Sequence, residues 1–93
     1  MAVYRLSRAA EIKLVEIYEY SYENFGEARA DAYVASLEET FQVLADAPRM
    51  GRQFRQRRRH DHAEHAIFYR IIDGGIFITQ IFHHSENILA KLR

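Results

Sequence analysis

The chain changes its hydrophobic period once, near its middle, and this change limits the folds open to it. In the first half, apolar residues recur at intervals of three and four, which is the spacing of an amphipathic helix. After Pro48 and Gly51 they become β-branched or aromatic and run in short stretches, which is typical of strands. The sequence therefore predicts helices first and a sheet afterwards.

The first half predicts two helices that fold back on each other. One runs from Arg8 to about Asn24 behind Ser7, a residue type favoured as an N-cap, and the other runs from Glu27 to Asp46. The connection at "NFG" spans only two or three residues, so the helices must form an antiparallel hairpin. The predicted buried stripes are Ala10, Leu14, Ile17, Tyr18, Ser21 or Tyr22 and Phe25 in the first helix, and Ala30, Tyr33, Val34, Leu37, Phe41 and Leu44 in the second.

The second half predicts a β-hairpin. Residues 65–72 ("HAIFYRII") and 76–84 ("IFITQIFHH") have strand composition, and "DGG" separates them. Residues 4–7 ("YRLS") predict a short first strand, "QFRQRR" an irregular one, and "SENILAKLR" a single helical turn or a docking strand. Both faces of residues 65–72 are apolar, which predicts that the sheet is covered on both faces or presents one to a partner. The predicted fold is α+β in the order β-α-α-β-β-β, an antiparallel sheet on a helical hairpin.

Composition narrows the class of protein. The 93 residues predict one domain over 1–93, and an apolar fraction of 48% suffices for a core. The chain has no cysteine, and the absence of a signal-like N-terminus or long apolar run leads us to expect a cytoplasmic protein without membrane contact. The formal net charge is zero, yet acidic residues dominate the first half and basic residues the second, which indicates two faces with different partners, one bipolar face, or neutralisation between the halves.

The order and spacing of these residues resemble ParE-type toxins of the RelE/ParE superfamily of toxin–antitoxin systems. The resemblance covers about Tyr4 to Leu89, and its motifs are "IFYR" at 67–70 and "IFITQIFHH" at 76–84, in which His83 stands at the family's histidine. In the first half it is carried by Leu6, Ser7, Ala10, Leu14, Ile17, Tyr18, Phe25-Gly26, Tyr33, Leu37, Phe41, Leu44, Pro48 and Gly51-Arg52.

The resemblance implies a toxin that is bound and neutralised by a ParD-like antitoxin and that inhibits DNA gyrase. The antitoxin is expected to carry a ribbon-helix-helix domain, so that DNA is contacted only through the antitoxin. No cofactor, metal or catalytic residue is expected. The expected antitoxin-binding residues are Leu14, Tyr18, Tyr22, Tyr33, Leu37, Phe68 and Arg70. The expected target-binding residues are Arg52, Arg55, Arg57, Arg58, Arg59, Arg70, His83 and His84.

Two alternatives stay open. A RelE-like mRNA endonuclease would need an acid–base set, for which Arg70, His83 and His84 are the candidates, although the terminal tyrosine and sheet lysines of RelE-type sequences are missing. A non-toxic antitoxin-binding relative is the second, because Ser85 and Asn87 stand where the family often carries a basic residue and Asp. The histidines of "HDHAEH" are expected to be solvated, because the adjacent arginines oppose a divalent cation.

Overall fold

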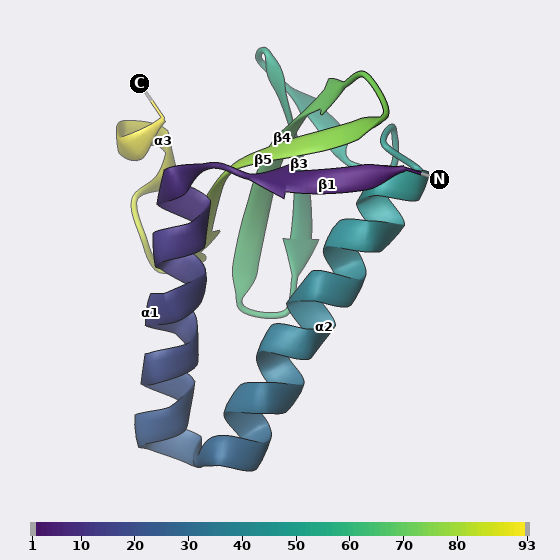
Figure 1. Cartoon of the computed structure of the whole chain (residues 1–93). Coiled ribbons are helices and arrows are strands. Elements are labelled where there is room, and N and C mark those ends of the chain that lie inside the picture. Colours follow the sequence, from purple (N-terminus) through teal and green to yellow (C-terminus); the bar gives the residue numbers. More distant parts are fainter. Residues whose placement is uncertain (1, 93) are drawn as a thin grey trace.

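The computed structural model describes residues 2–92 and places two long helices against one sheet (Figure 1). This arrangement confirms the predicted α+β class with an N-terminal helical hairpin. The elements in chain order are β1 (Val3–Leu6), α1 (Arg8–Phe25), α2 (Glu27–Asp46), β2 (Arg52–Phe54), β3 (Arg57–His62), β4 (His65–Ile72), β5 (Gly75–His83) and the short α3 (Ile88–Lys91).

A single residue, Gly26, joins α1 to α2, where the sequence predicted a connection of two or three residues. Gly26 adopts a φ of 90° and a ψ of 169°, a conformation that side-chain-bearing residues avoid. Its N–H donates to the Tyr22 carbonyl at 3.0 Å and ends α1, while its carbonyl accepts from the Ala30 N–H at 3.1 Å and begins α2. The helices meet at Gly26 and diverge toward the sheet (Figure 1).

The sheet has five strands in the order β1-β5-β4-β3-β2. Two predictions are corrected by this topology. The sheet is not wholly antiparallel, because β1 lies parallel to β5. The arginine-rich segment is not a single irregular strand but a hairpin of β2 and β3, which turns at Arg55 with a φ of 56°. Arginine has little strand preference of its own, and the β3 ladder forms because β4 offers it a paired edge.

The helices cover one face of the sheet, and the chain's own tail covers part of the other, so each of the two sequence alternatives holds in part. On the helix side, Ile67 and Tyr69 of β4 pack with Leu37 and Phe41 of α2. On the opposite face, the buried residues are Ala66, Phe68, Phe82 and Leu92, with Phe54 and Ile88 packed against them. The tail therefore forms a helical turn that covers part of the second face.

Tyr69 joins the end of α2 to the start of β2. Its hydroxyl donates to the Pro48 carbonyl at 2.7 Å and accepts from the Gly51 N–H at 2.9 Å. A Cβ on Gly51 would lie 2.4 Å from that hydroxyl, so glycine is required by close approach. Across residues 2–92, no helix is both long and apolar enough to cross a bilayer.

Candidate functional site

A groove of about 890 Å³ opens between the diverging helices and reaches the end of β4 and β5. Tyr20 and Phe25 lie in it with 63% and 55% of their surfaces exposed, which is unusual for aromatic residues of a small domain. Arg29 of α2 stacks over the Phe25 ring at 5.2 Å. Further apolar lining comes from Ile17, Ala32 and Tyr33, and the polar lining residues are Lys13, Glu16, Ser21, Ser36, Glu64, His65, His83, Ser85 and Glu86.

His65 forms the buried wall of the groove at the start of β4. Its Nδ1 lies 2.6 Å from the Tyr33 hydroxyl, within hydrogen-bond distance, and that hydroxyl accepts from the Glu64 N–H at 3.3 Å. The His65 ring packs edge-on against His83 with centroids 5.2 Å apart. Burial disfavours the charged imidazolium, and His83 and Lys13 add positive charge, so the pKa of His65 falls from 6.5 to about 4. His65 is therefore neutral at pH 7.

The low pKa of His65 makes stability depend on pH in a definite direction. The unfolded chain binds a proton at His65 below pH 6.5, whereas the folded chain does so only near pH 4, so acid favours unfolding. We expect the free energy of unfolding to fall by about 2 kcal/mol from pH 7 to pH 5. Urea titrations at the two pH values measure this loss. His65→Gln is expected to abolish the loss of unfolding free energy, whereas His60→Gln is expected to keep it. An equal change of unfolding free energy with pH in both variants would contradict the assignment of the loss to His65.

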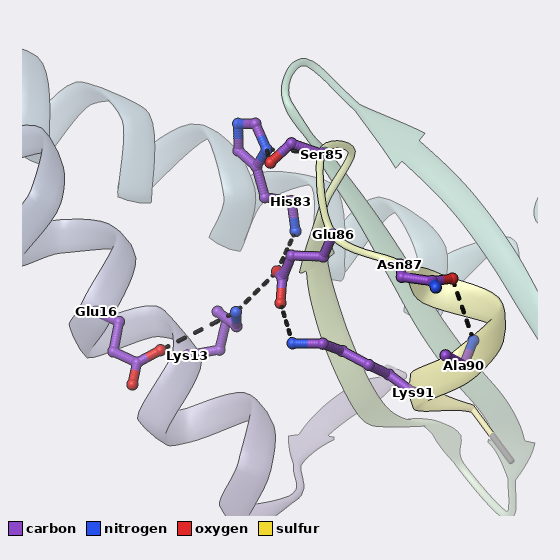
Figure 2. Close-up of polar contacts among 8 residues, drawn as sticks. All are labelled: Lys13, Glu16, His83, Ser85, Glu86, Asn87, Ala90 and Lys91. Carbon is purple, nitrogen blue, oxygen red and sulfur yellow. Dashed lines mark hydrogen bonds and ion pairs between the residues drawn. The ribbon is translucent and has the colours of Figure 1, made fainter.

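Glu86 anchors the corner between β5 and α3 to α1 (Figure 2). One carboxylate oxygen accepts from Lys13 Nζ at 2.9 Å and from the His83 N–H at 2.8 Å, and the other accepts from Lys91 Nζ at 2.9 Å. Burial opposes ionisation of Glu86, but the hydrogen bonds from Lys91, His83 and Lys13 outweigh it and lower its pKa to about 2. The groove rim is thus held by a fixed carboxylate.

The predicted antitoxin-binding residues do not form one surface. Tyr33 alone of that set lines the groove. Leu37 and Phe68 are fully buried, on opposite faces of the sheet, and their prediction as contact residues is corrected because the chain's own core covers them. Tyr18 and Tyr22 line a separate, smaller hollow, where Tyr18 donates to Asp31 at 2.9 Å. Leu14 packs against the helix-side core, and Arg70 is exposed on the other face.

Most of the predicted target-binding arginines share the sheet face that points away from the helices. Strand register places Arg59 beside the buried Phe68, Arg52 beside Arg59, and Arg57 beside Phe54. Two further arginines, Arg5 and Arg70, flank Phe77 on that face, because both pair with it. We call this surface the arginine face; it comprises Arg5, Arg52, Arg57, Arg59 and Arg70, with Arg55 at the β2–β3 turn.

Three residues of the predicted target-binding set lie apart from the arginine face or at its edge. Arg58 points to the helix side, where it donates to the Gly51 carbonyl at 2.6 Å. His83 lines the groove, and its Nδ1 lies 2.7 Å from the Ser85 hydroxyl. His84 lies 3.7 Å from Asp61 at the end of the sheet. The predicted solvated histidine His62 instead contacts the hydroxyls of Ser36 at 3.0 Å and Thr40 at 3.2 Å.

The ion pairs argue against neutralisation of the β2 and β3 arginines by the acidic helices. Within residues 2–92, no ion pair joins an arginine of β2 or β3 to a carboxylate of α1 or α2. Arg52 and Arg59 instead share Asp61, at 3.6 and 2.9 Å. The acidic helices and the arginine face are therefore separate surfaces of the molecule.

The candidate acid–base set for RNA cleavage is not assembled. His83 pairs with His65 at one end of the β4–β5 hairpin, and Arg70 pairs with Phe77 toward the other. Five residues separate Arg70 from His65, which is about 17 Å along a strand. His83 lines the helix-side groove, whereas Arg70 is on the arginine face. A single scissile phosphate cannot reach both side chains.

Comparison with known proteins agrees with this architecture. Residues 4–88 match the family model described as ParE toxin of type II toxin-antitoxin system, parDE. The chain belongs to the ParE toxin family. It is 33% identical to Toxin ParE1 of Caulobacter vibrioides over 96 residues, covering 99% of both chains, and 29% identical to Toxin ParE1 of Mycobacterium tuberculosis, covering 96% of both.

A solved structure confirms the ParE-like fold. The chain superposes with a TM-score of 0.74 on a chain of the chromosomal ParDE TA system from P. aeruginosa, covering 89% of this chain and 96% of that one. Their sequence identity is 20%, so this likeness concerns the fold. The ParE resemblance inferred from residue order is confirmed by the family model and the sequence relatives, and the fold by the solved structure.

Proposed function

We propose that this ParE toxin is neutralised by a segment of a ParD-like antitoxin bound in the groove between α1, α2 and the His65 wall. The observation that carries the proposal is the pair of exposed aromatic rings, Tyr20 and Phe25, inside a concave surface. Large aromatic residues in concave sites are the usual anchors of protein interfaces. The groove rim carries both signs of charge, as an amphipathic helix laid in a groove requires at its flanks.

The toxin's target is proposed to be DNA gyrase, in agreement with the ParE family. Support comes from the separation of Arg70 from His83, which favours action by binding over cleavage. The arginine face and the adjoining tail at α3 are the proposed contact surface, because they are charged and not covered by the helical hairpin. An antitoxin with a ribbon-helix-helix domain would place the complex on DNA. Action on gyrase implies a cytoplasmic protein.

Expression of the chain alone tests this function. The antitoxin is expected to be encoded by the neighbouring reading frame. We expect growth arrest when the toxin is made alone, and restored growth when toxin and antitoxin are made together. Purified toxin is expected to reduce gyrase supercoiling at least about tenfold at saturation, because a stoichiometric inhibitor removes active enzyme. Supercoiling gels measure the effect, and pre-incubation with the antitoxin is expected to reverse it.

The outcomes separate the alternatives. Growth arrest with unaffected supercoiling and new mRNA 5′ ends would identify an endonuclease and reject gyrase as the target. Unimpaired growth at a verified level of folded protein would identify a non-toxic antitoxin-binding relative. Binding of the antitoxin outside the groove would reject the proposed docking site without changing the family.

A further inference from the structure

The arginine face carries positive charge on four of the five strands of the sheet. Arg5 lies on β1, Arg70 on β4, Arg57 and Arg59 on β3, and Arg52 on β2. Adjacent strands are about 4.8 Å apart, so the five-stranded sheet carries this charge over about 19 Å. A surface of this length and sign suits an extended polyanion better than a single small anion.

Several of these guanidinium groups are held by aromatic rings of the same sheet. Arg70 lies over Phe77 at 4.9 Å, Arg59 over Phe68 at 5.6 Å, and Arg55 over Phe54 at 5.6 Å. Stacking fixes a guanidinium while its N–H groups remain available at the edge, which is the geometry for bidentate contacts to phosphate. Ordering these side chains in advance reduces the entropy lost on binding.

Carboxylates neutralise this face only at one end. Asp61 accepts from Arg59 and lies near Arg52, and these two contacts lower the pKa of Asp61 against the effect of its burial. Within residues 2–92, no carboxylate forms an ion pair with Arg5, Arg57 or Arg70. Most of the positive charge is therefore available to an external partner.

The charge of the arginine face and its lack of an open central ring favour nucleic acid over protein as its binding partner. Cores of protein interfaces are depleted of charge and rely on accessible apolar anchors, whereas interfaces with nucleic acid are strongly positive. Here the central ring, Phe68, is fully buried and covered by Arg59. Base stacking would need open rings, so phosphate contacts are the available mode of recognition.

We propose that the arginine face binds the phosphodiester backbone of nucleic acid directly and without sequence preference. Such binding would be separate from the DNA contact that the antitoxin makes. It rests on the proposed target-binding role of the arginine face and specifies what that face contacts. About 19 Å of sheet corresponds to about five phosphates of one duplex strand at 3.4 Å each. Nucleic acid held by the target would then contribute to toxin binding.

Fluorescence anisotropy with labelled 20-nucleotide DNA, single-stranded and duplex, tests the proposal on the full chain in the absence of gyrase. With about five phosphate contacts, we expect affinity for the duplex to fall about 500-fold between 50 and 200 mM NaCl. The double variant Arg57→Gln, Arg70→Gln is expected to reduce the slope of log affinity against log salt by about 2. The double variant Arg8→Gln, Arg49→Gln removes equal charge elsewhere and is expected to keep the slope.

Three results would overturn the proposal. These are no binding of either DNA at 50 mM salt by folded protein, an equal loss in both double variants, and binding of polyglutamate by the arginine face without binding of DNA. The last result would assign the face to an acidic protein segment. Because gyrase is absent from the assay, a lack of DNA binding would reject this proposal without testing gyrase inhibition. The supercoiling assay tests gyrase inhibition separately.

Discussion

Replacement of both Tyr20 and Phe25 by alanine is expected to weaken antitoxin binding at least about 100-fold, the largest functional effect among the variants considered. Each ring is more than half exposed within the groove, so truncation removes contact area for the partner without opening a cavity in the core. Aromatic anchors of this kind contribute about 2 kcal/mol or more each when fully desolvated in a complex. Titration calorimetry with the protein of the neighbouring reading frame measures the loss.

Tyr22→Ala provides the matched control for this experiment. Tyr22 is 51% exposed on the same helix, but it lines the smaller hollow with Tyr18 instead of the groove. We expect its truncation to change antitoxin affinity less than about threefold, because a rim contact contributes little. A large loss with Tyr22→Ala and none with the double variant would place the antitoxin on the Tyr18–Tyr22 surface, which the sequence had indicated, and would reject the groove.

Gly75→Ala is expected to cost about 3–5 kcal/mol of unfolding free energy, the largest effect on stability. A Cβ at Gly75 would lie 1.7 Å from the Val3 carbonyl oxygen, and backbone cannot move aside as a side-chain rotamer can. Strand β1 must then leave β5, which breaks the parallel pairing from Val3 to Leu6. Urea unfolding followed by far-ultraviolet circular dichroism measures the loss.

The adjacent glycine is the control for this substitution. Gly74 has a φ of 79° and open space around its Cβ position, so Gly74→Ala introduces backbone strain without overlap. Its expected cost is about 1–2 kcal/mol. If Gly75→Ala destabilises the chain no more than Gly74→Ala does, β1 does not pack on β5 at this distance in solution.

Patterns that depend on neighbours in sequence were predictable. The Ser7 side chain accepts from the Ala10 N–H at 3.0 Å, as expected of an N-cap, and α2 spans the predicted residues Glu27–Asp46. Helices satisfy their backbone hydrogen bonds locally, so composition and period suffice to locate them. The β4–β5 hairpin was equally predictable, because only two residues connect its strands.

Features that depend on packing between distant segments were not predictable. Tyr20 lies outside the apolar stripe of α1, and nothing in its spacing distinguishes it from a solvated residue; it becomes part of a groove only because the helices diverge. Leu37 and Phe68 were expected to contact a partner, yet the chain's own sheet and tail bury them. Whether an apolar residue faces the core or a partner depends on the element that covers it, and the hydrophobic period of the sequence does not reveal that element.

The sequence by itself determined the helical hairpin, the order of elements, the charge asymmetry and the ParE family, because these rest on local periodicity and residue order. Only the tertiary structure decided how the charges are distributed. Strand register brought Arg5, more than 45 residues from Arg52, onto one face with the β2–β3 arginines, and it turned Arg58 to the other side. Neighbours on a strand point to opposite faces, so most of the five arginines between Arg52 and Arg59 become a surface only once pairing fixes the register.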